Sequence, residues 1–170
     1  MLRIGAVVLV LLVGGTWQVV ARFYELAPGG LVLDGPRPAD RRTGSSEMDM
    51  SYALGPDLRY PVRFSMRNPS ALPVTVEGID DGSDVITIED ARIETAGGDL
   101  RPFPAAIGPG AEFVVVFTLR IRTPDDEPCR KRLLGGMELR FSVLGVSRLQ
   151  QSSHDVSFLT PGPECDDLIL

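Results

Sequence analysis

Residues 112–122, EFVVVFTLRIR, form the most regular apolar–polar alternation in the chain. The positions that share one side of such a strand are all apolar: Phe113, Val115, Phe117, Leu119 and Ile121. Polar or charged residues occupy much of the other side: Thr118, Arg120 and Arg122. Because successive side chains of a β-strand point to opposite faces, this pattern predicts a strand with one buried and one solvated face.

The same period of two recurs on both sides of this strand. It occurs in residues 60–67 (YPVRFSMR), 73–79 (PVTVEGI) and 137–146 (MELRFSVLGV), and Val156 and Phe158 mark a last strand. Residues 85–95 predict either one bent strand or two short ones. Turn residues, drawn from 18 Gly and 14 Pro, separate these segments.

These patterns predict an all-β domain over residues 50–170. About seven half-buried strands are expected, and no amphipathic segment of helix length interrupts them. Two sheets that face each other would bury both apolar faces. We therefore expect an immunoglobulin-like antiparallel β-sandwich of about seven strands, preceded by one N-terminal transmembrane helix.

The N-terminal segment, residues 1–25, predicts the membrane anchor. Residues 4–21 (IGAVVLVLLVGGTWQVVA) carry no charge, and a helix of that length spans ~27 Å, close to the ~30 Å hydrocarbon thickness of a bilayer. The residues expected to mark the anchor are Ile4, Val10, Trp17 and Ala21. Two alternatives remain: a secretory signal cleaved near Ala21, and a buried N-terminal core helix.

Residues 26–49 are expected to be a flexible linker. The stretch 34–47 (DGPRPADRRTGSSE) is rich in Pro, Gly, Ser and charge, and it has no apolar period. The short apolar group 31–33 (LVL) is either a first edge strand or membrane-proximal chain.

The two cysteines, Cys129 and Cys165, predict one disulfide. An even count of cysteines in a chain with an export signal favours a disulfide bridge, which would stabilise the fold by about 3–4 kcal/mol. Neither cysteine belongs to a CxxC zinc pattern. Two reduced, buried thiols are the alternative. A disulfide would place the C-terminal domain outside the cytoplasm, so we expect a single-pass protein of the cell membrane with an extracytoplasmic domain.

Residues 60–79, YPVRFSMRNPSALPVTVEGI, contain the pattern R-N-x-x-x-x-P-V-T-V-x-G. This segment, together with residues 108–112 and 139–148, resembles small membrane-anchored proteins of actinobacterial type over about residues 50–160. Those proteins are mostly uncharacterised. The resemblance implies an exported immunoglobulin-like sandwich and implies no activity.

Catalytic and metal-binding motifs are weak in this sequence. The single histidine, His154, stands between Ser153 and Asp155, whose side chains alternate on a strand and do not form a relay by adjacency. Met48 and Met50, with His154, offer soft ligands for copper. Met66 shares its alternation with core positions and is better explained as core.

An acidic turn is a second weak metal candidate. Asp80, Asp81 and Asp84 surround Gly82, but their spacing does not match a calcium loop, and acidic residues are common in turns. No cofactor is expected. The net charge of −6 also disfavours nucleic acid as a partner, because phosphates attract basic surfaces.

The sequence thus predicts a non-enzymatic, membrane-anchored extracytoplasmic module. Its expected partners are the lipid bilayer, through the N-terminal helix, and another envelope protein that it binds, scaffolds or assists. The alternative is an exported protein that binds a metal, copper or calcium, or a small ligand.

Overall fold

A computed structural model of the chain describes residues 15, 17, 19, 21, 23–33, 51–53, 58–80, 86–121, 131–134, 137–152 and 156–159. The regular structure after residue 26 in these ranges is β-strand. The strands are β1 (Ala27–Leu33), β2 (Ser51–Ala53), β3 (Arg59–Arg67), β4 (Val74–Asp80), β5 (Ile86–Thr95), β6 (Leu100–Arg101), β7 (Ala105–Ile107), β8 (Glu112–Ile121), β9 (Lys131–Leu134), β10 (Glu138–Val143), β11 (Val146–Gln151) and β12 (Val156–Leu159).

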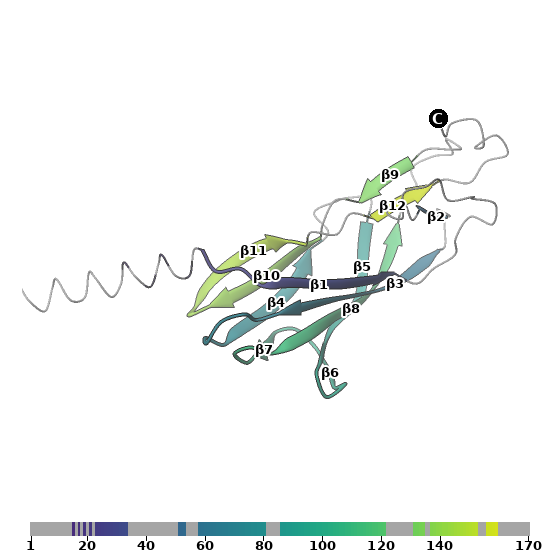
Figure 1. Cartoon of the computed structure of the whole chain (residues 1–170). Helices are drawn as coiled ribbons and strands as arrows, with labels where there is room; N and C mark the ends of the chain where they lie inside the picture. The colour runs from purple at the N-terminus through teal and green to yellow at the C-terminus, as the bar shows by residue number, and fades with distance from the viewer. Residues whose placement is uncertain are drawn as a thin grey trace, which may run out of the picture.

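Nine of these strands form two antiparallel sheets. The five-stranded sheet has the order β1-β3-β8-β5-β6, and the four-stranded sheet has the order β11-β10-β4-β7 (Figure 1). Strand β3 lies against the whole length of β8, from Arg59 opposite Arg120 to Arg67 opposite Glu112. The prediction of an all-β, antiparallel fold is confirmed.

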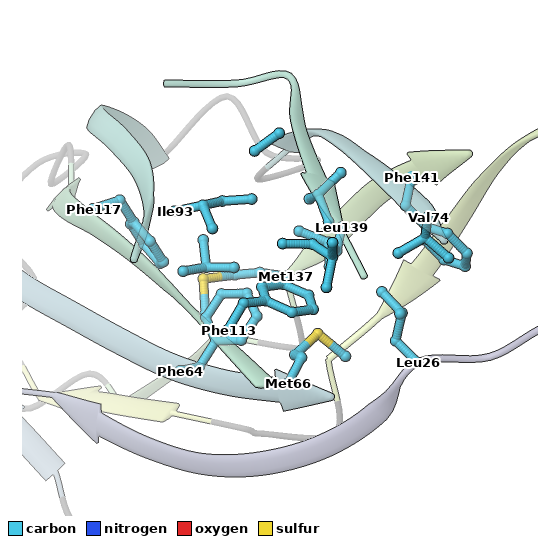
Figure 2. Close-up of a cluster of buried hydrophobic side chains, with 14 of the residues drawn as sticks. Leu26, Phe64, Met66, Val74, Ile93, Phe113, Phe117, Met137, Leu139 and Phe141 are labelled. Atoms are coloured by element: carbon cyan, nitrogen blue, oxygen red, sulfur yellow. The ribbon is translucent and has the colours of Figure 1, made fainter. Parts of the chain in front are cut away.

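Apolar side chains from both sheets meet in one core. Figure 2 shows Phe64 and Phe117 of the five-stranded sheet in the same cluster as Leu139 and Phe141 of the four-stranded sheet. The rings of Phe64 and Phe117 pack edge to face, with centroids 6.2 Å apart. Burying a side chain of this size contributes about 1.5–3 kcal/mol, so this core supplies most of the stabilisation.

The faces predicted for β3, β8 and β10 are confirmed. The side chains of these strands that are fully or almost fully buried are Tyr60, Val62, Phe64, Met66, Phe113, Val115, Phe117, Leu119, Leu139, Phe141 and Val143. Met66 therefore belongs to the core, as its alternation with Val62 and Phe64 indicated. The side chain of Ile121 lies outside the described residues.

The first strand occupies chain that was expected to be linker. Residues 27–33 form β1, which pairs antiparallel with β3: Leu31 lies opposite Phe64 and Leu33 opposite Val62. Leu31 and Leu33 pack against the core while Val32 points outward. The sandwich thus begins at residue 27 rather than at residue 50, and the edge-strand alternative for residues 31–33 is correct. Three alternating residues are too few to distinguish a strand from extended linker.

The stretch 85–95 contains one bent strand. Strand β5 pairs with β8, and its register shifts between Glu89 and Arg92, where Asp90 has a φ of 55°. Such a bulge inserts residues into one strand and bends it. This irregularity explains why the apolar period breaks in the middle of the segment.

The stretch 137–146, expected as one strand, ends earlier than its alternation suggests. Strand β10 ends at Val143 and pairs with β11 through a two-residue turn, Leu144 and Gly145, with φ of 52° and 78°. Positive φ at both positions is typical of the type I′ turn, which matches the twist of a hairpin. Asn-Gly or Asp-Gly is the usual sequence signal for this turn. Leucine at position 144 replaces the usual Asn or Asp, so the turn is not evident from the sequence.

Three further strands lie at the end of the molecule opposite the N-terminal helix (Figure 1). Strand β12 pairs parallel with β2 and antiparallel with β9, with Leu159 opposite Lys131. The last strand predicted at Val156 and Phe158 is confirmed. Strand β9 is not among the strands predicted from the sequence.

Candidate functional site

Most of the residues proposed for chemistry lie outside the described part of the chain. They are Ile4, Val10, Met48, Met50, Asp81, Asp84, Cys129, His154 and Cys165. Asp80 is described: it ends β4, is exposed, and its carboxylate lies 3.6 Å from the guanidinium of Arg140. Within the described ranges, no three His, Cys, Asp or Glu side chains gather in a way that would hold a metal ion.

The N-terminal helix is described at residues 15, 17, 19 and 21. Trp17 is 45% exposed, and Ala21, near the end of the helix, is fully buried against the sandwich. Among the residues that the structure describes, we find no helix with both the length and the apolar character needed to cross a membrane.

The richest cluster of polar contacts joins this helix to the sandwich. We call it the helix–sandwich junction; it comprises Ala21, Tyr24, Leu26, Asn68, Ser70, Arg148 and Gln150. Between the helix and β1 the exposure of the chain alternates: Tyr24 and Leu26 are buried, while Phe23 and Glu25 are exposed. The ring of Tyr24 lies 6.1 Å from that of Phe141, so this segment extends the core.

Asn68 is at the centre of the junction and is fully buried. Its side-chain nitrogen donates to the carbonyls of Leu72 at 2.8 Å and Gly108 at 3.0 Å, with a longer contact of 3.4 Å to that of Ile107. One side chain thereby satisfies carbonyls of the β3–β4 turn and of the chain that follows β7. Part-buried carbonyls that lack a partner destabilise a fold, so Asn68 stabilises both turns.

The side-chain oxygen of Asn68 faces the segment that follows the helix. It accepts hydrogen bonds from the hydroxyl of Tyr24 and, at 3.3 Å, from the backbone N–H of Ser70. The hydroxyls of Tyr24 and Ser70 lie 2.8 Å apart, at hydrogen-bonding distance. The turn that follows β3 and the chain that follows the helix are therefore linked through a single amide group.

Strand β11 holds the same segment from a second direction. The side-chain amide of Gln150 accepts from the N–H of Leu26 at 2.8 Å and donates to its carbonyl at 2.8 Å, as a neighbouring strand would. Arg148 donates to the carbonyls of Tyr24 and, at 3.3 Å, of Ala21. A guanidinium is well suited to this place, because carbonyls at the end of a helix lack partners and carry partial negative charge.

Among the residues that the structure describes, two ionisable groups of the sandwich have shifted pKa values. Burial raises the pKa of Tyr60 to about 12. Hydrogen bonds from Ser147, at 2.7 Å, and from Ser142 lower the pKa of Glu77 on the outer face of the four-stranded sheet. The hydrogen bonds of the junction, in contrast, hold backbone groups in place.

The residues of the junction carry little signal in the sequence. Asn68 belongs to the R-N pattern quoted above, and that pattern indicates no contact with the N-terminal segment. Tyr24 is 44 positions from Asn68, and Leu26 is 124 positions from Gln150. Single polar residues so far apart give no periodic signal. The only available indication was an asparagine at the end of a strong strand.

Comparisons with known proteins do not identify a family. No family model matches the chain, and no curated protein matches it. Among solved structures, the chain is similar to the Vibrio cholerae VesB protease, with 12% sequence identity and a TM-score of 0.41 over 84% of this chain and 34% of that one. The chain thus spans about a third of that protein's length. We draw nothing on activity from a likeness of this size.

Proposed function

We propose that this chain is a membrane-anchored, extracytoplasmic immunoglobulin-like module that binds, scaffolds or assists another protein of the cell envelope and is not an enzyme. The observation that carries this proposal is the helix–sandwich junction. The helix continues into β1 through a segment fixed by Asn68, Arg148 and Gln150. Arg148 also contacts the carbonyl of Ala21, which favours a retained helix over a signal cleaved at that residue.

The strand order supports the immunoglobulin-like assignment. Immunoglobulin constant-type domains have the strand order A-B-E-D in one sheet and G-F-C in the other. With β1, β3, β4, β5, β8, β10 and β11 as A to G, the two sheets match this order, and β6 and β7 are additional short edge strands. Asn68, which lies in the pattern that carries the resemblance to actinobacterial-type anchored proteins, joins the two turns.

The pairing of β9 with β12 supports the proposed disulfide. Lys131, at the start of β9, lies opposite Leu159, at the end of β12. Cys129 precedes the first of these residues closely and Cys165 follows the second, so both leave the strand pair from the same end. At ~3.3–3.6 Å per residue the intervening chain is long enough for the two sulfurs to meet.

Topology and mass measurements test the proposal on the full chain. A C-terminal tag should be digested by protease added to intact spheroplasts, and the chain should stay in the membrane after alkaline carbonate extraction. The intact mass of the mature protein should correspond to a chain that retains residues 1–22. After reduction and alkylation, this mass should increase by the modification of two cysteines. A protected tag, or a mass that begins after Ala21, would contradict the anchor.

Capture of a partner and metal analysis separate the binding module from the alternative carrier. Crosslinking in intact cells followed by solubilisation should recover a discrete partner with the full chain. Stoichiometric copper or calcium in the purified protein would favour an exported metal-binding protein instead.

A further inference from the structure

We propose that the sandwich is seated directly on the bilayer, with the Leu144–Gly145 hairpin tip and Phe23 in the lipid headgroup layer. The hairpin tip and Phe23 contact the same membrane that the N-terminal helix enters. The inference rests on the proposed function, because it requires the helix to be retained in the membrane.

The direction of β11 relative to the helix is the first argument. Gln150 contacts Leu26, and Arg148, two residues closer to the hairpin, contacts Tyr24 and Ala21. From Gln150 to Arg148 the strand therefore runs toward the helix, and the tip at Leu144 lies farther in the same direction. Figure 1 shows the β10–β11 tip at the end of the sandwich from which the helix leaves.

Apolar exposure at this end is the second argument. Phe23, whose backbone N–H donates to the carbonyl of Val19, is 77% exposed, and Leu144 is 36% exposed. Trp17 and Val19 of the helix are exposed as well. Tyr24 is bonded inward, and the alternation of the segment therefore holds Phe23 outward. Aromatic and apolar side chains of this kind are stable at the boundary between lipid and water.

The backbone of Leu144 is the third argument. A leucine with φ of 52° adopts a conformation that asparagine and glycine tolerate far better. Strain of this kind persists where the surroundings support it, and it is concentrated at functional positions. At a hairpin tip beside the helix, a leucine gains apolar contact from lipid that asparagine would not gain.

The junction makes this contact a consequence of the anchor. The described chain between Ala21 and β1 is held by Asn68, Arg148 and Gln150, so the hairpin tip keeps a fixed position relative to the end of the helix. A bilayer that encloses the helix therefore brings its headgroup layer toward the tip without further ordering of the chain.

Tryptophan quenching in lipid nanodiscs tests the proposal on the full chain. The native chain has one tryptophan, Trp17, which reports the helix itself. The double variants Trp17→Phe/Leu144→Trp and Trp17→Phe/Phe23→Trp report the proposed contact. Trp17→Phe/Val32→Trp is the matched control, because Val32 is 62% exposed at the far end of β1.

We expect lipids brominated near the headgroups to quench the tryptophans at positions 17, 23 and 144 and to blue-shift the emission of the last two. The control at position 32 should show neither effect. Quenching at position 17 without quenching at 23 and 144 would overturn the seating while leaving the anchor intact. Loss of quenching at all three positions would contradict both proposals.

The alternative to lipid is that a second copy of the chain covers the hairpin tip. It would produce a blue shift at position 144 that grows with the number of chains per nanodisc and is insensitive to brominated lipid. That result would overturn the membrane contact. The variant at Phe23 keeps the test decisive if substitution at the hairpin disturbs folding.

Discussion

The interior between the two sheets and the helix–sandwich junction stabilise the molecule by different means. The interior consists of aromatic and aliphatic side chains such as Phe64, Phe117 and Leu139, whose packing has no required direction. The junction consists of polar groups around Asn68, each of which needs a partner at a particular place. Apolar burial tolerates exchange of side chains of similar volume, whereas a buried amide tolerates almost none.

This difference has a consequence for function. The interior determines that the chain folds into a sandwich, whereas the junction determines how that sandwich is oriented relative to the N-terminal helix. Variants in the two regions should therefore have different effects. Interior variants should lower global stability, and junction variants should loosen the connection to the helix.

Truncation of an interior ring should give the largest effect. Phe64→Ala leaves a cavity beside Phe117 and should lower the free energy of unfolding by about 3–5 kcal/mol. Val32→Ala, at a position that is 62% exposed on the neighbouring strand, should change it by less than about 0.5 kcal/mol. Denaturant unfolding of the full chain in detergent measures both. Equal effects would contradict the assignment of the core.

Removal of the central amide should give the next largest effect. Asn68→Ala removes the donor from the part-buried carbonyls of Leu72 and Gly108 and should cost about 1–3 kcal/mol. Hydrogen exchange should also accelerate at the amide of Leu26, because the segment after the helix loses an attachment. Tyr24→Phe removes one hydroxyl only and should cost about 1 kcal/mol. Unchanged exchange in Asn68→Ala would show that the junction does not hold this segment.

The two regions also differ in how much of them the sequence predicts. The faces of β3, β8 and β10 were predicted correctly, because burial on one side of a strand imposes a period of two that neighbouring residues share. Strands β6 and β7 are too short to show a period. The hairpin at Leu144 was hidden because the leucine continues the apolar alternation through the turn.

The junction was not predicted for a physical reason. Each of its bonds joins residues that are close only after the sheets form, such as Leu26 and Gln150, and a single glutamine carries no periodic signal. The extension of the sandwich to residue 27 was missed for the same reason. Its first strand is held by pairing with β3 rather than by a pattern of its own.

High pH should probe Tyr60, a phenol of the interior whose pKa is shifted. The pKa of Tyr60 is raised from its ordinary value of 10.0 to about 12, so the folded state retains this proton after the unfolded state has lost it. Stability is therefore fully present below pH 10 and should decline as the pH rises toward 12, by up to about 2 kcal/mol in total. Tyr60→Phe should remove this part of the decline in a pH series of denaturant unfolding. An identical decline in that variant would exclude Tyr60 as its cause.

Substitution in β1 should test how closely the first strand is fixed. A Cβ at Gly29 would lie 2.1 Å from the hydroxyl oxygen and 2.8 Å from the carbonyl oxygen of Ser65. Gly29→Ala should therefore separate β1 from β3 locally and cost about 1–3 kcal/mol. Gly30→Ala is the matched control, since its Cβ would meet nothing within 4 Å. Faster hydrogen exchange in β1 is expected in the first variant alone.

The smallest effect should have the opposite sign. Leu144→Asn places a residue suited to positive φ in the β10–β11 turn and should raise the free energy of unfolding in detergent by about 0.5–1 kcal/mol. Leu149→Asn, at a position that is 52% exposed within β11, relieves no strain and should not stabilise the fold. If the hairpin tip contacts lipid, the gain at position 144 should shrink in nanodiscs, because the leucine then loses a favourable environment on substitution. An equal gain in detergent and in nanodiscs would mean that Leu144 strains the turn without compensation from the membrane.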